Sequence, residues 1–141
     1  MEKLEFKRIA LDTDILIDIL RKNDLIIKRI NEIEKESVIF ATTIINSFEL
    51  YYGAYKSKKK KNVELVRELL GRLNILNWEP SNSEIIGKNF YELEKIGKKI
   101  DYRDLFIGMI VLKNDYTLLT RNIKHFERIP NLKILNLNNI N

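Results

Sequence analysis

Apolar residues fall into two kinds of segment along the chain: short continuous runs, and longer stretches with apolar positions three and four apart. Short runs between turn residues are typical of strands buried on both faces, whereas the longer spacing is typical of helices with one buried side. The pattern predicts strands at 8–11, 37–41, 75–78, 116–119 and 132–137. It predicts helices at 15–21, 25–35, 44–54, 63–73 and 105–112, one capped by Ser81 or Ser83 that runs to about 96, and a turn at 123–126.

Strands and helices alternate almost throughout this pattern. Such alternation favours an α/β fold, with a largely parallel central sheet in a three-layer α/β/α arrangement. The sequence contains no internal repeat and no linker-like segment, and 141 residues suffice for one buried core. We therefore expect a single domain over 1–141.

Two predicted helices carry acids whose surroundings can be inferred from spacing. In helix 44–54, the spacing of Ile45, Phe48 and Tyr52 predicts the buried side, and Glu49 lies beside it. A carboxylate there needs a partner, because burying an unpaired charge is costly. In helix 15–21, we expect Asp18 on the solvated face, paired with Arg21 or Lys22.

Polar side chains also follow the predicted strands. The carboxyl ends of parallel strands meet at one edge of a sheet, where ligands bind in this class of fold. We therefore expect four groups of oxygen-bearing side chains to converge: Asp12, Glu49 after Thr42-Thr43, Asp104, and the segment from Thr120 to Asn122.

Helix capping is the alternative explanation for these acids. Asp12 and Asp101 each precede a helix, where Asp is a favourable N-cap, and Asp104 falls in a first turn, where the helix dipole favours negative charge. Capping accounts for each acid separately, whereas a shared site accounts for their common placement. Both interpretations stay open from the sequence.

The composition restricts the chemistry of a shared site. The chain has no cysteine and one histidine, His125, which disfavours zinc sites and a Ser-His-Asp triad. Acids held close together repel one another unless a cation binds. Oxygen ligands suit Mg²⁺ or Mn²⁺, and a metal–carboxylate site with a basic rim is suited to cutting nucleic-acid backbones.

Charge and hydropathy indicate the setting in which the protein works. The 25 basic and 20 acidic residues give a net charge of +5, with many lysines at 56–61. We expect Lys58, Lys59, Lys60 and Lys61 to attract RNA, although a solvated helix start without a role explains them equally. No apolar run approaches the ~20 residues that span a bilayer, and none at the N-terminus matches a signal peptide, so a cytoplasmic location is expected.

These residues resemble the PIN-domain family, and more narrowly the VapC-type toxin ribonucleases. The resemblance covers nearly the whole chain and rests on the order and spacing of several short blocks. The blocks are Leu11-Asp12-Thr13-Asp14 with Leu16-Ile17-Asp18, Asn46-Ser47-Phe48-Glu49-Leu50 with Gly53, Asp104-Leu105-Phe106-Ile107, and Leu119-Thr120-Arg121-Asn122 with Phe126.

The resemblance implies a PIN-like fold and an Mg²⁺- or Mn²⁺-dependent endoribonuclease. It makes Asp12, Glu49 and Asp104 the three core acids, with Asn122 where many members carry a fourth acid. Asp101 then adds negative charge or only caps its helix, and Thr120 hydrogen-bonds an acid or a metal-bound water. The resemblance also implies a homodimer inhibited by a VapB-type antitoxin.

Two other functions compete with this one. Leu11-Asp12-Thr13-Asp14 also resembles the nucleophile motif of haloacid-dehalogenase-type phosphatases, with Asp12 as nucleophile, but Glu49 would then have no use. A non-catalytic RNA-binding module would use the lysines alone, and it predicts strong salt dependence without metal dependence.

Overall fold

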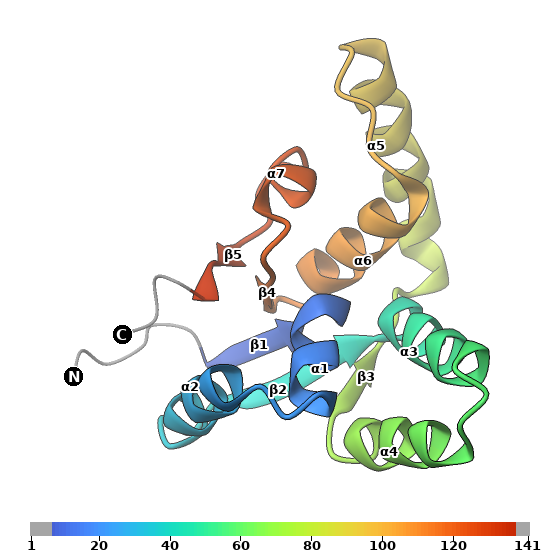
Figure 1. Ribbon diagram of the computed structural model, residues 1–141. Coiled ribbons are helices and arrows are strands. Elements are labelled where there is room, and N and C mark those ends of the chain that lie inside the picture. Colours follow the sequence, from blue (N-terminus) through green and yellow to red (C-terminus); the bar gives the residue numbers. More distant parts are fainter. Residues whose placement is uncertain (1–6, 138–141) are drawn as a thin grey trace.

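The computed structural model describes residues 7–137, and its centre is a five-stranded, all-parallel sheet in the order β3-β2-β1-β4-β5 (Figure 1). The central strands β1 and β4 are short apolar runs, buried on both faces as the sequence predicts. The fold prediction, a largely parallel sheet in an α/β/α domain, is confirmed. The strands are β1 Arg8–Leu11, β2 Ile39–Thr43, β3 Asn74–Leu76, β4 Thr117–Leu119 and β5 Ile134–Leu135.

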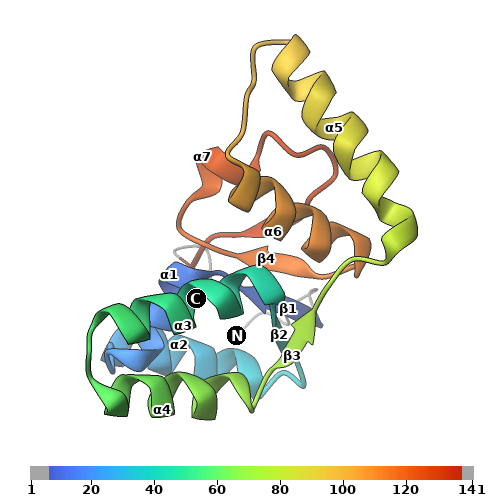
Figure 2. The ribbon, with the colours of Figure 1, turned by 90° about the vertical axis from the view of Figure 1, so that its right-hand side faces the viewer.

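Helices cover both faces of the sheet (Figure 2). Along β1, Ile9 and Leu11 join the core under α1, α2, α3 and α4, whereas Ala10 joins the core under α5, α6 and α7. This two-residue alternation gives the domain its three layers. The helices are α1 Thr13–Leu20, α2 Asp24–Glu34, α3 Ile44–Lys56, α4 Lys60–Leu70, α5 Ser83–Lys95, α6 Tyr102–Lys113 and α7 Ile123–Phe126, with a 3-10 turn at Pro80–Asn82.

Several element boundaries differ from the sequence prediction for local reasons. Strand β2 starts later than position 37 because Ser37 has a left-handed backbone, with φ 61°, in the turn after α2. Neither Ser81 nor Ser83 caps α5, since its N-cap is Asn82, at the end of the 3-10 turn. Helix α4 begins at Lys60, so Lys60 and Lys61 lie in its first turn, and Lys58 and Lys59 in the preceding loop.

The buried side of α3 was predicted incorrectly. Phe48 and Tyr52 are 64% and 57% exposed, and their rings stack on the outside with centroids 6.0 Å apart. The residues that α3 buries are Asn46, Leu50 and Ala54, four apart. Asn46 can be buried on this side because Asp12 and Thr43 form hydrogen bonds with it there.

Helix α6 is buried over most of its length and fixes the position of Asp104 in its first turn. A methyl group added at Gly108 would collide with Ile129, so the missing Cβ lets the segment after α7 pack closely on α6. Among the described residues, no helix is both long and apolar enough to cross a membrane.

Candidate active site

Asp12 lies where β1 ends and α1 begins, and its side chain is buried, with the residue 4% exposed. One oxygen, Oδ2, accepts a hydrogen bond from Thr120 Oγ1 at 2.7 Å. The other, Oδ1, accepts from the backbone N–H of Thr13 at 2.8 Å and from Asn46 Nδ2 at 3.0 Å. Asp12 is therefore both the N-cap of α1 and the centre of a polar cluster, so the two interpretations of this acid are compatible.

The charge on Asp12 is poorly compensated in this environment. Burial raises the pKa of the Asp12 carboxyl from its ordinary value of 3.8 to about 6, although its three hydrogen bonds lower it. The hydrogen-bond donors are neutral, and nearby Asp14 raises the pKa further. A bound cation would stabilise the ionised form of this carboxylate.

Glu49 reaches the same region from α3. Its Oε1 accepts a hydrogen bond from Thr13 Oγ1 at 2.9 Å, and its side chain is only 22% exposed. Its Oε2 lies 3.5 Å from Arg103 Nη1, which comes from α6. The Glu49 carboxylate thus has the partners that its position on the helix requires.

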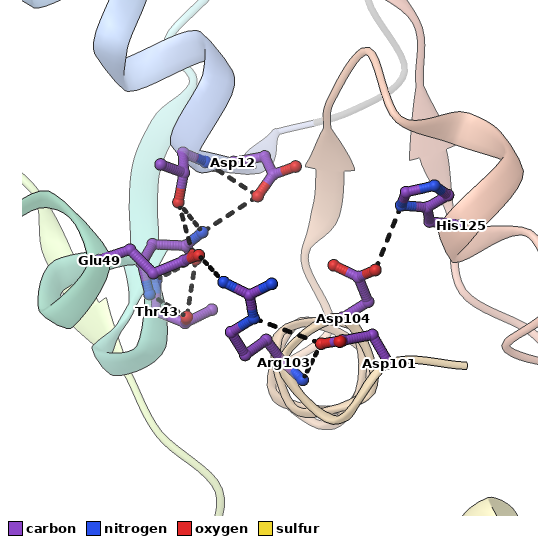
Figure 3. Close-up of polar contacts among 9 residues, drawn as sticks. Asp12, Thr43, Glu49, Asp101, Arg103, Asp104 and His125 are labelled. Carbon is purple, nitrogen blue, oxygen red and sulfur yellow. Dashed lines mark hydrogen bonds and ion pairs between the residues drawn. The ribbon is translucent and has the colours of Figure 1, made fainter. Parts of the chain in front are cut away.

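The third acid, Asp104, points toward this region from the first turn of α6 (Figure 3). Burial raises the pKa of its carboxyl, against the lowering effect of His125, whose Nδ1 lies 3.2 Å from Asp104 Oδ2. Asp101 is the N-cap of α6 and accepts the backbone N–H of Arg103 at 2.8 Å, which lowers its pKa. The Arg103 guanidinium lies between Glu49 and Asp101.

Two acidic side chains of α1 contact the loop after β4. The backbone N–H of Arg121 donates to Asp14 Oδ2 at 3.0 Å, and the Arg121 guanidinium pairs with Asp18. The prediction that Asp18 lies on a solvated face was wrong: its side chain is 17% exposed, and its partner is this remote arginine. Asn122 is exposed; its backbone N–H donates to Thr120 Oγ1 at 3.0 Å, and its side chain does not cap α7.

The acids surround one region without closing on a single point. Among residues 7–137, no three His, Cys, Asp or Glu side chains lie close enough together to hold one metal ion. The donor set nevertheless fits a hard cation, because it consists of carboxylates and includes the buried, poorly compensated Asp12. Sequence reasoning missed Asn46, Arg103 and Arg121 as neighbours of these acids, although Asn46 stands at the third helical position after the cap Thr43, as in a capping box.

Comparison with known proteins places the chain in a family. Residues 9–132 match the PIN domain. The chain is 32% identical to "Ribonuclease VapC2" of Haemophilus influenzae, over 89% of this chain and 95% of that protein, and 33% identical to "Ribonuclease VapC1" of Methanocaldococcus jannaschii, over 92% and 85%. The structure of VapBC2 from Rickettsia felis bound to a promoter DNA fragment superposes with a TM-score of 0.81, at 34% identity over 92% of this chain and 98% of that one. The chain therefore belongs to the PIN domain family, in its VapC-type branch.

Family membership also bears on the competing functions. The relatives named as ribonucleases favour RNA cleavage over a phosphatase that would leave Glu49 unused. They also favour an enzyme over a module that only binds RNA.

Proposed function

We propose that the protein is an Mg²⁺- or Mn²⁺-dependent endoribonuclease and the toxin of a VapBC-type toxin–antitoxin pair. The observation that carries the proposal is the arrangement of Asp12, Glu49 and Asp104, which come from the junction of β1 and α1, from α3 and from α6, and point toward one region. Helix capping explains Asp12 and Asp101, but it does not explain Glu49 in the middle of α3. The similarity to proteins named VapC ribonucleases supports the same conclusion.

The roles of the residues follow from their surroundings. Asp12, Glu49 and Asp104 would hold the ion, and Asp101 would add negative charge beside it. A bound divalent cation supplies positive charge for the reacting phosphate and lowers the pKa of a coordinated water. Thr120 orients Asp12 through its 2.7 Å hydrogen bond, and Arg103 at the exposed rim offers a guanidinium to an RNA phosphate.

The proposal is tested by incubating the purified protein with a mixed RNA substrate in Mg²⁺, in Mn²⁺ and in excess EDTA. We expect internal cleavage with either metal and none in EDTA. Cleavage that persists in EDTA would contradict the metal-dependent chemistry. A covalent phosphoryl group on Asp12, or phosphate release without chain cleavage, would favour the phosphatase.

Two protein partners belong to the same proposal. Solved neighbours of this chain are VapBC complexes, so we propose that a VapB-type antitoxin binds and inhibits it. We also propose a homodimer. Exposed stacked aromatic rings such as Phe48 and Tyr52 are typical of protein contact surfaces, and they support that assembly.

The homodimer predicts a measurable mass. Light scattering should give about twice the 16.8 kDa of one chain. A variant in which both Phe48 and Tyr52 are replaced by Glu should have a mass closer to that of a single chain, because charges would then be buried at the interface. Unchanged dimerisation of this variant would place the interface elsewhere, and a monomeric wild-type protein would contradict the dimer.

The lysines predict a salt effect. Lys58, Lys59 and Lys60 line a hollow of 380 Å³ between α3 and α4, together with Tyr55 and Arg67. Changing Lys58–Lys61 to Gln should weaken RNA binding. The negative slope of log affinity against log salt concentration should become less steep by up to about 3. Turnover at saturating RNA should change little. Filter binding at several salt concentrations measures this slope. An unchanged slope would mean that the lysines form only a solvated helix start.

Asp101 should differ from Asp104 in its response to substitution. Asn is as good an N-cap as Asp, so Asp101→Asn should keep the fold, whereas Asp101→Ala should cost about 0.5–2 kcal/mol. We expect Asp101→Asn to lose activity at limiting Mg²⁺ and to recover as Mg²⁺ rises, unlike Asp104→Asn. RNA cleavage measured against Mg²⁺ concentration distinguishes the two roles of Asp101, as a helix cap alone or as negative charge beside the metal. Wild-type behaviour at every concentration would make Asp101 a cap alone.

A further inference from the structure

One buried side chain, Asn46, contacts the candidate site without being an acid. It is 0% exposed on the inner face of α3, one helical turn before Glu49. A buried amide with unmet hydrogen bonds would destabilise the fold, so its partners show what holds it in place. Those partners are Asp12, Thr13 and Thr43.

The donor side of Asn46 faces Asp12 and Thr13. Nδ2 donates to Asp12 Oδ1 at 3.0 Å and to Thr13 Oγ1 at 2.9 Å. The Thr13 hydroxyl in turn donates to Glu49 Oε1 at 2.9 Å. Asn46 thus contacts one carboxylate directly and the other through a single hydroxyl.

The acceptor side of Asn46 is fixed to the end of β2. Oδ1 accepts from Thr43 Oγ1 at 2.7 Å and from the Thr43 backbone N–H at 3.3 Å. The reversed amide orientation would put Oδ1 against the Asp12 carboxylate, so this network allows one orientation only. Nδ2 donates two hydrogen bonds and Oδ1 accepts two. The amide therefore cannot rotate without breaking hydrogen bonds to Asp12 and Thr13 on one side and to Thr43 on the other.

We propose that Asn46 is a positioning residue, which sets the separation of the Asp12 and Glu49 carboxylates and so favours Mg²⁺ over larger cations. The inference rests on the metal-dependent function proposed above. Mg²⁺ demands near-ideal octahedral geometry at about 2.0–2.1 Å, whereas Ca²⁺ accepts flexible ligands at about 2.3–2.6 Å. Freeing the two carboxylates should therefore weaken Mg²⁺ binding more than Ca²⁺ binding.

Four variants separate positioning from stability. Asn46→Ala removes the amide, and Thr13→Val removes, at nearly constant shape, the hydroxyl that accepts from Asn46 and donates to Glu49. Thr13→Ser restores that hydroxyl. Ser47→Ala is the matched control, because it removes a 3.2 Å hydrogen bond to the Thr43 carbonyl in the same helical turn without reaching either acid.

The first measurement is the concentration of Mg²⁺, or of Ca²⁺, that gives half of the maximal thermal shift without RNA. The second is the Mg²⁺ concentration that half-saturates RNA cleavage, compared with turnover at saturating Mg²⁺. For Asn46→Ala and Thr13→Val, we expect half-saturating Mg²⁺ to rise about 10–100-fold, as is typical when a partner of a metal ligand is removed. Ca²⁺ should change less, and Thr13→Ser and Ser47→Ala should resemble wild type.

Each contrary result has a distinct meaning. If Asn46→Ala and Thr13→Val only lower the unfolding temperature and leave half-saturating Mg²⁺ unchanged, Asn46 is structural and the inference is overturned. An equal loss for Mg²⁺ and Ca²⁺ overturns it as well. If Asn46→Ala does not fold, Thr13→Val decides alone. A wild-type protein without any metal-dependent shift or cleavage would overturn the proposed function together with this inference.

Discussion

In metal-free buffer, the free energy of unfolding should fall by on the order of 2 kcal/mol between pH 4 and pH 7 through Asp12 alone. The cause is the raised pKa of the buried Asp12 carboxyl, about 6 in the folded protein against an ordinary 3.8. Between these two pH values the folded state binds the proton more tightly than the unfolded state. The stabilising effect of that proton is complete below the lower pKa and is lost as pH rises through the upper one.

The Asp12→Asn variant isolates this effect. Asn is a good N-cap, so α1 keeps its start, while the titrating group is gone. The pKa values of Asp14 and Asp104 are also raised, chiefly by burial, but both groups remain in the variant and cancel in the difference. Urea unfolding from pH 4 to pH 8 in EDTA should therefore show a shallower decline for Asp12→Asn. Parallel curves would mean that Asp12 titrates normally. Adding Mg²⁺ should stabilise wild type more than the variant.

Neutralising any one of the three core acids should abolish RNA cleavage. Asp12→Asn, Glu49→Gln and Asp104→Asn should each lower the rate at saturating RNA by at least about a hundredfold, the scale on which losing transition-state charge stabilisation acts. Each change removes one ionised ligand at almost constant shape, so the fold should survive. Some variants should even be more stable without metal, because repulsion between acids is relieved.

A matched control shows whether charge or position matters. Asp115→Asn makes the same chemical change on an exposed residue just beyond the opposite end of α6 from Asp104. Asp115 has a left-handed backbone, with φ 59°, which Asn also adopts readily. We expect this variant to cleave RNA like wild type. A comparable loss in Asp115→Asn would point to net charge, not to the candidate site.

The sequence predicted the sheet because strands and helices depend on short-range patterns. Strand β1 was predicted at its observed bounds, and Asp12 and Thr120 came together because parallel strands end at the same edge. The buried side of α3 was predicted wrongly because Phe48 and Tyr52 are large aromatic residues at helical spacing, a pattern typical of a buried side, yet both are exposed. The buried partner of Asn46 is 34 residues away in the chain and cannot be read from local spacing.

The error at Asp18 has the same origin. Local spacing offered Arg21 and Lys22 as partners, but the structure pairs Asp18 with Arg121, which reaches α1 from the loop after β4. The position of Arg103 between Glu49 and Asp101 likewise depends on how α6 packs against α3. These contacts depend on tertiary packing, which a single sequence does not encode at any fixed spacing.

The rate of RNA cleavage by Asp104→Asn at saturating Mg²⁺ tests the central claim most directly. Asp104 comes from α6, and His125, which contacts it, lies outside the Asp12–Asn46–Glu49 network, so the loss of the Asp104 carboxylate should leave that network intact. Wild type and Asp115→Asn should cleave the same RNA at the same rate, and Asp104→Asn should show no cleavage above an EDTA control, with thermal unfolding confirming its fold. Full activity of a folded Asp104→Asn would contradict the assignment of this site.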